Sequence, residues 1–126
     1  MEMHDPGCEL VFVYGSLKRG GHNHYLLQTS VCMGEWRTRE LFSLYDLGPF
    51  PAVCLEGGSR ISGEVYQVSP GTMADLDALE GYPGWYQRTQ IDTCYGRAWI
   101  YYLQSAPADG VLIDCGEWRP AQAVAG

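Results

Sequence analysis

Positive charge is scarce in this chain of 126 residues. Eight lysine and arginine residues stand against fifteen aspartate and glutamate residues, which gives a formal net charge of −7 at pH 7. An acidic chain repels the phosphate backbone that a nucleic-acid-binding protein must attract. The composition therefore predicts no nucleic-acid partner. We expect the basic residues Lys18, Arg19, Arg37 and Arg39 on a solvated loop or strand face.

Long apolar runs are lacking as well, since no stretch reaches the roughly 20 residues of a membrane-spanning helix. The first ten residues, MEMHDPGCEL, have neither the basic start nor the apolar core of a secretory signal. These absences predict a cytoplasmic protein without a membrane partner. The length and a hydrophobic fraction of 46% favour one folded domain over residues 1–126, with its core at about 9–105 and a tail at 106–126.

No C-x-x-C motif occurs among the cysteines, and their number is odd: Cys8, Cys32, Cys54, Cys94 and Cys115. This pattern argues against a disulfide framework and a zinc site, and it predicts mostly buried free thiols. His22 and His24 supply too few ligands for a structural metal site, so we expect no metal. A cysteine hydrolase that uses Cys54 or Cys94 stays open as an alternative.

Sixteen glycines and seven prolines separate short runs of β-branched and aromatic residues. Such punctuation is typical of many short strands joined by tight turns. Short strands are predicted at residues 9–14, 34–47, 52–56 and 62–68, a hairpin at 85–93 and 98–104, and a short helix at 24–29. The predicted fold is an α+β domain, mixed but mostly antiparallel and closed as a small β-barrel, with one main helix and one short helix.

The main helix is predicted within residues 69–83. Ser69 is a good N-cap and Pro70 suits the first helical position. Gly81 provides a left-handed stop, and Pro83 prevents the helix from continuing.

A glycine-rich turn follows the first strand in VFVYGSLKRGGHNH, residues 11–24. Consecutive backbone N–H groups at Gly15 and Ser16 form a concave nest that suits a small anion. A nucleotide-binding P-loop is excluded because positions 21 and 22 are glycine and histidine, where lysine and serine or threonine are required. Ser16 lacks the G-x-S-x-G context of a nucleophile. From the loop alone, a turn chosen only for its geometry remains the alternative.

Glu80 occupies the last turn of the predicted helix, where the negative end of the helix dipole disfavours a carboxylate. Burial among neighbouring aromatic residues would raise its pKa further, toward the range of an efficient proton carrier. The alternative is a solvated glutamate. Asp75 and Asp77 on the same helix are expected to be exposed. The aromatic residues among which Glu80 would be buried are Tyr82, Trp85 and Tyr86.

The glycine turn at 11–24, followed by DALEGYPGWYQR at 77–88, resembles the γ-glutamylcyclotransferase-like (AIG2-like) family. The resemblance is closest to its short members, the γ-glutamylamine cyclotransferases, and it extends from residue 10 to about 103. It implies a mixed barrel whose glycine loop and helix-end glutamate face one pocket. It also implies a cofactor-free reaction in which the α-amine of a γ-glutamyl group attacks its own side-chain amide, releasing 5-oxoproline and a free amine.

Under this resemblance Glu80 is the general acid/base. The γ-glutamyl group is held by Tyr14, Gly15, Ser16 and Leu17. Tyr86 either bonds the substrate or Glu80 or is a core aromatic residue, and Arg88 is expected to form a structural pair. The segment LGPFP, residues 47–51, either walls the pocket or ends a strand. We expect a monomer with a small-molecule substrate; a non-catalytic module that binds a carboxylated metabolite is the alternative.

Overall fold

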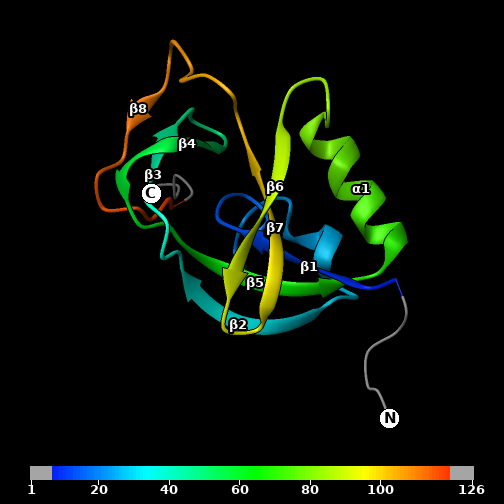
Figure 1. Ribbon diagram of the computed structural model, residues 1–126. Helices are drawn as coiled ribbons and strands as arrows, with labels where there is room; N and C mark the ends of the chain where they lie inside the picture. The colour runs from blue at the N-terminus through cyan, green and yellow to red at the C-terminus, as the bar shows by residue number, and fades with distance from the viewer. Residues whose placement is uncertain (1–6, 120–126) are drawn as a thin grey trace.

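The structure is a computed structural model that describes residues 7–119. Its strands form a five-stranded sheet in the order β2-β5-β1-β7-β6 and a three-stranded sheet in the order β4-β3-β8 (Figure 1). A short 3₁₀ helix, His24–Leu27, follows the first strand. The other elements are β1 (Glu9–Val13), β2 (Val31–Arg37), β3 (Phe42–Asp46), β4 (Pro51–Ser59), β5 (Ser62–Val68), α1 (Pro70–Glu80), β6 (Gln87–Thr93), β7 (Gly96–Tyr102) and β8 (Val111–Leu112).

β1 is the central strand of the larger sheet. It pairs antiparallel with β5 and parallel with β7, so the sheet is mixed, whereas every other pairing in the two sheets is antiparallel. Val11, Phe12 and Val13 are all buried, which explains the near-continuous apolar run of this strand. The predicted α+β class, with one main helix and a mostly antiparallel sheet, is confirmed.

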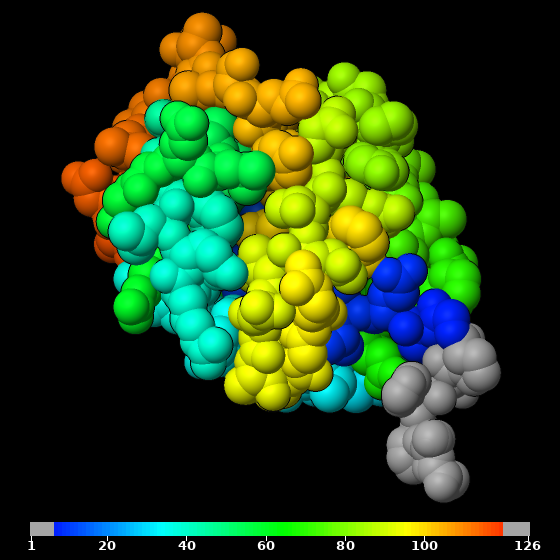
Figure 2. Space-filling model, viewed as in Figure 1, coloured from blue at the N-terminus to red at the C-terminus, as the bar shows by residue number. Residues whose placement is uncertain are grey.

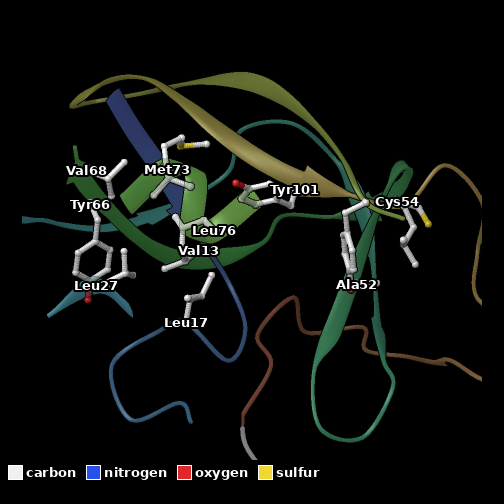
Figure 3. Packing of buried hydrophobic residues seen from close by; sticks show 13 residues of the cluster. Val13, Leu17, Leu27, Ala52, Cys54, Tyr66, Val68, Met73, Leu76 and Tyr101 are labelled. Atoms are coloured by element: carbon white, nitrogen blue, oxygen red, sulfur yellow. The ribbon is translucent and has the colours of Figure 1, made fainter. Parts of the chain in front are cut away.

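α1 packs against one face of the larger sheet. Ser69 caps it by accepting a hydrogen bond from the Thr72 N–H, and Gly81 ends it in the left-handed conformation at φ 65°, as the sequence predicts. Met73 and Leu76 of α1 belong to one apolar cluster with Val13 of β1, and Leu76 lies beside Val13 (Figure 3). The β6–β7 hairpin lies across the centre of one face, between α1 and the smaller sheet (Figure 2).

The strand predicted over residues 34–47 is wrong in one respect, because the chain changes sheets within it. Thr38 is fully buried. Its hydroxyl donates to the Glu40 carbonyl at 2.9 Å and accepts from the Ile61 N–H at 2.8 Å. These bonds satisfy the Glu40 carbonyl and the Ile61 N–H, which lie outside the β-strands. The chain therefore leaves the larger sheet at Arg37 and enters the smaller one at Phe42.

The two sheets do not close into a barrel, and the Tyr14 hydroxyl lies where closure would occur. The Leu103 N–H donates to the Val53 carbonyl at 2.8 Å, which is one of the two bonds of a parallel bridge between β4 and β7. In place of the other bond, the Tyr14 hydroxyl accepts from the Val53 N–H at 3.1 Å and donates to the Tyr101 carbonyl at 2.8 Å. The hydroxyl thus joins the two sheets beside a single direct backbone bond.

Trp118 returns the tail to the body of the domain. Its side chain is buried, and its indole N–H donates to Asp46 Oδ1 at 3.0 Å. The tail also supplies β8, which extends the smaller sheet beside β3 and which the sequence did not predict.

The expectation of mostly buried cysteines is wrong. Only Cys54 is buried, Cys8 is half-buried, and Cys32, Cys94 and Cys115 are exposed. The exposed positions follow from the topology, since Cys32 lies on an edge strand and Cys94 in a hairpin turn. Within residues 7–119, no three histidine, cysteine or acidic side chains gather as metal ligands. In the same range, no helix has the length and apolar character to cross a membrane.

Tyr14→Phe should destabilise the protein by about 1–3 kcal/mol, because it leaves the buried Val53 N–H and Tyr101 carbonyl without their partner. Urea unfolding followed by circular dichroism measures this change. Tyr102→Phe is the matched control, since the Tyr102 hydroxyl has no hydrogen-bond partner among residues 7–119 and its loss should cost less than about 0.5 kcal/mol. Equal stability of the two variants would contradict a structural role for the Tyr14 hydroxyl.

Candidate active site

A pocket of about 140 Å³ lies where the end of β1 meets the start of β4 and the end of α1. The turn after β1 forms one wall, and Glu80 with the residues that follow α1 forms the opposite wall. The two motifs singled out in the sequence therefore share one cavity. Its lining consists of Phe12, Val13, Tyr14, Gly15, Ser16, Leu17, Asn23, Phe50, Pro51, Leu79, Glu80, Trp85, Tyr86 and Tyr101.

Close packing of the main chain requires glycine at two positions in the turn. A Cβ atom at Gly15 would lie 2.5 Å from the Pro51 ring, and one at Gly21 would collide with the Ser16 carbonyl oxygen. Asn23 fixes the turn from within. Its N–H donates to the Ser16 carbonyl at 3.0 Å and its side-chain amide donates to Ser16 Oγ at 2.9 Å. The turn is thus a rigid wall of the pocket.

The backbone N–H groups of Gly15, Ser16 and Leu17 remain available in this wall. Within residues 7–119 they donate to no protein acceptor. All three residues are buried and line the pocket. Successive unpaired N–H groups in a concave turn attract an anion, and an anionic group in the pocket would satisfy them.

Glu80 is the last residue of α1, and its side chain is partly buried against the pocket. Its carboxylate forms no hydrogen bond or ion pair with any residue in 7–119. Burial raises the pKa of this carboxyl to about 7, far above its ordinary value. Near neutral pH the group therefore exists in both protonation states, which suits the transfer of a proton in either direction.

Asp77 was expected to be exposed, and that expectation is wrong. Its carboxylate accepts two hydrogen bonds from Arg88 Nη1, at 2.9 and 3.1 Å, and a third from the Tyr101 hydroxyl at 2.7 Å. The Arg88 guanidinium lies 4.5 Å from the ring centres of both Tyr82 and Trp99. Arg88 is thus the structural pair that the sequence predicted, and Asp75 is exposed as expected.

This ion pair anchors the last turn of α1 to β6 and β7. Asp77 lies one turn before Glu80, and its carbonyl also accepts the Tyr82 N–H at 2.9 Å. The helix end that carries Glu80 is therefore held by two groups of Asp77. The side chain binds the sheet, and the carbonyl binds the loop after the helix.

Tyr14 and Tyr86 line the pocket with their hydroxyl groups already engaged. The Tyr86 hydroxyl donates to the Pro51 carbonyl at 3.0 Å, and Tyr14 makes the two bonds described above. Both side chains are buried, and burial raises the pKa of each phenol. The structure places Tyr86 in the core with its ring forming part of the pocket wall.

The sequence predicted LGPFP as a possible wall, and its residues Phe50 and Pro51 do line the pocket. It did not single out Leu79, which lines the cavity from the end of α1, and it named Trp85 only as an aromatic neighbour of Glu80. A run of glycine, tyrosine and tryptophan after a helix stop was the only signal for Trp85.

Neither cysteine weighed as a nucleophile lines the pocket. Cys94 lies in the exposed turn between β6 and β7. Cys54 is buried in β4, and burial raises the pKa of its thiol, which opposes thiolate formation. The structure therefore gives the cysteine hydrolase alternative no support.

Comparisons with known proteins point to one family. The family model described as "Gamma-glutamyl cyclotransferase, AIG2-like" matches residues 11–120. A Vibrio cholerae protein provisionally named a gamma-glutamylcyclotransferase is 46% identical over 109 residues, which cover 86% of this chain and 94% of that protein. The Escherichia coli gamma-glutamylcyclotransferase family protein YtfP is 38% identical over 109 residues, with 86% and 94% covered.

Solved structures agree with these sequence matches. The solution structure of Escherichia coli YtfP superposes with a TM-score of 0.70 at 37% identity and covers 86% of this chain and 95% of that one. An AIG2-like protein from Mus musculus has a TM-score of 0.75 at 26% identity, with 90% of each chain covered.

Glu80→Gln should stabilise the folded protein at about pH 8 by roughly 1–3 kcal/mol. The folded pKa near 7 exceeds the ordinary value of 4.5, so the folded state binds the proton more tightly. Wild-type stability then falls as the pH rises through this window, and glutamine removes that loss. Denaturant unfolding at several pH values measures the difference, which should shrink as the pH falls toward about 4. Asp75→Asn, exposed on the same helix, should show no such pH dependence.

Proposed function

The chain belongs to the AIG2-like gamma-glutamyl cyclotransferase family, and on that basis we propose that it cleaves γ-glutamyl amides by cyclisation. The α-amine of the substrate attacks its own γ-carbonyl carbon and releases 5-oxoproline and a free amine. The observation that carries the proposal is that Glu80, a carboxyl with a pKa of about 7, shares one small pocket with the backbone nest, and that neither has a hydrogen-bond partner among residues 7–119.

The nest holds the γ-glutamyl group. Its α-carboxylate accepts hydrogen bonds from the N–H groups of the turn formed by residues 14–17, which carries no charge of its own. The rings of Tyr14 and Tyr86 limit the space beside it, since both are fixed by their own hydrogen bonds. A substrate confined in this way is curled so that its amine meets its carbonyl carbon, which removes much of the entropic barrier to ring closure.

Glu80 moves the protons that the reaction requires. The α-amine of the substrate has an ordinary pKa of about 8 and is mostly protonated at neutral pH, so the Glu80 carboxylate first accepts a proton from it. The freed amine forms the new C–N bond, and the γ-carbonyl oxygen becomes negative. Glu80 then donates its proton to the departing nitrogen as the original amide C–N bond breaks. The Glu80 carboxylate then takes the extra proton from the ring nitrogen and passes it to the released amine. The amine leaves as an ammonium ion, and Glu80 ends as the carboxylate.

Glu80→Gln should lower kcat for 5-oxoproline release by about 10²–10⁴-fold, because glutamine neither accepts nor donates the proton. Release is measured on a panel of γ-glutamyl amides by chromatography of 5-oxoproline. Asp75→Asn removes the same charge from the same helix outside the pocket and should retain wild-type activity. Equal activity of wild type and Glu80→Gln would remove Glu80 from the mechanism. Substrate binding without any 5-oxoproline would instead favour a non-catalytic module for carboxylated metabolites.

The pH dependence provides a separate check. Glu80 must be ionised in the free enzyme to act as the base, so kcat/KM should fall on the acid side with a midpoint near pH 7, the pKa of this carboxyl. The residual activity of Glu80→Gln should lack that acid limb. A midpoint near 4.5 in the wild type would show that the carboxyl is solvated and would contradict its proposed environment.

A further inference from the structure

Phe50, Leu79 and Trp85 supply an apolar part of the lining of the pocket that contains Glu80, and we call this part the mouth. The Trp85 side chain is 51% exposed and that of Leu79 is 37% exposed, so both present apolar surface to an incoming molecule. The ring of Trp85 meets Phe50 edge-to-face at 5.5 Å and Tyr86 at 4.9 Å. These contacts hold the indole in the lining of the pocket that Glu80 also lines.

The charges around this mouth restrict what it can accept. Among the described residues that line the pocket, none is lysine, arginine or histidine, and Glu80 is the one carboxylate. Arg88 is occupied by Asp77, and the Lys18 ammonium donates to the Trp118 carbonyl at 2.8 Å. A leaving amine with its own carboxylate would therefore find no cation, and Glu80 would repel it. A distant ammonium would likewise find no acidic partner apart from the catalytic group.

We propose that the Phe50–Leu79–Trp85 mouth is the leaving-group subsite and that it selects arylalkylamines that carry no charged group besides the amine itself. The inference rests on the proposed cyclotransferase reaction and names the amine that it releases. In this arrangement the substrate is a γ-glutamyl arylalkylamide. Its γ-glutamyl end lies against the backbone nest, and its ring packs on Trp85 and Phe50. The ring of the substrate takes no part in the bonds that form and break. It contributes to binding because its apolar surface is buried against the mouth.

Two substrates that differ by one carboxylate test the selection directly. γ-Glutamylphenethylamide and γ-glutamylphenylalanine carry the same ring, and only the second has a carboxylate on the leaving amine. We expect kcat/KM to be at least about 10-fold higher for the phenethylamide. It should also exceed the value for γ-glutamylputrescine, whose leaving amine carries a distal ammonium. Equal or reversed preference in either comparison would overturn the subsite.

A variant separates the mouth from the reaction itself. Trp85→Ala should reduce the kcat/KM ratio of γ-glutamylphenethylamide to γ-glutamylethylamide by about 10-fold, because the small ethyl group cannot span the mouth. Tyr25→Ala is the control for loss of an exposed aromatic side chain, since Tyr25 is 61% exposed and does not line the pocket. It should leave the ratio unchanged.

The outcomes distinguish failure of the subsite from failure of the proposed reaction. If Trp85→Ala slows both amides equally, the subsite is wrong while the cyclotransferase reaction stands. If the wild type releases 5-oxoproline from none of the four substrates, the proposed reaction fails and the subsite falls with it.

Discussion

The Tyr14 hydroxyl is the interaction on which the rest of this structure depends. It replaces one bond of a parallel bridge between Val53 of β4 and the β7 backbone, and it lies beside the direct backbone bond from Leu103 to Val53. The two sheets are therefore joined here by one backbone bond and one side chain. The Tyr14 side chain that joins them also lines the pocket at the end of β1. The same residue begins the turn that forms the pocket wall, so architecture and site share one contact.

Glu80 shows how local geometry and tertiary packing combine to tune one group. Gly81 ends the helix directly after it, and the Asp77–Arg88 ion pair holds that end against the hairpin. The carboxyl is therefore kept partly buried, and no residue between 7 and 119 forms a hydrogen bond or ion pair with it. At basic pH, the free energy of unfolding would be larger with a neutral or a solvated side chain at position 80. Natural proteins tolerate such local instability at sites where a perturbed group has a use.

Elements determined by neighbouring residues were predictable from the sequence, whereas those determined by distant contacts were not. β5 is found at the predicted residues 62–68, and the cap and stop of α1 are as expected because Ser69 and Gly81 act within one turn. The break at Thr38 depends on Ile61, and the burial of Asp77 depends on Arg88 and Tyr101. No local pattern reports such partners.

The candidate site divides in the same way. The glycine turn and Glu80 were identifiable because each breaks a local rule, one by its run of glycines and the other by a carboxylate at the negative end of a helix. Their convergence came from the family resemblance, and the structure brings both to one cavity. The sequence placed Trp85 beside Glu80, but it did not predict the mouth that Trp85 forms with Phe50 and Leu79, because that grouping depends on contacts between distant segments.

The contact between Gly15 and the Pro51 ring links two positions that are far apart in the sequence. A side chain at position 15 would need the space that the ring occupies, with 2.5 Å between them. A side chain could therefore be accommodated at position 15 only if the residue at position 51 gave up that space. The identity of the turn residue is thus set by a proline that lies 36 positions further along the chain.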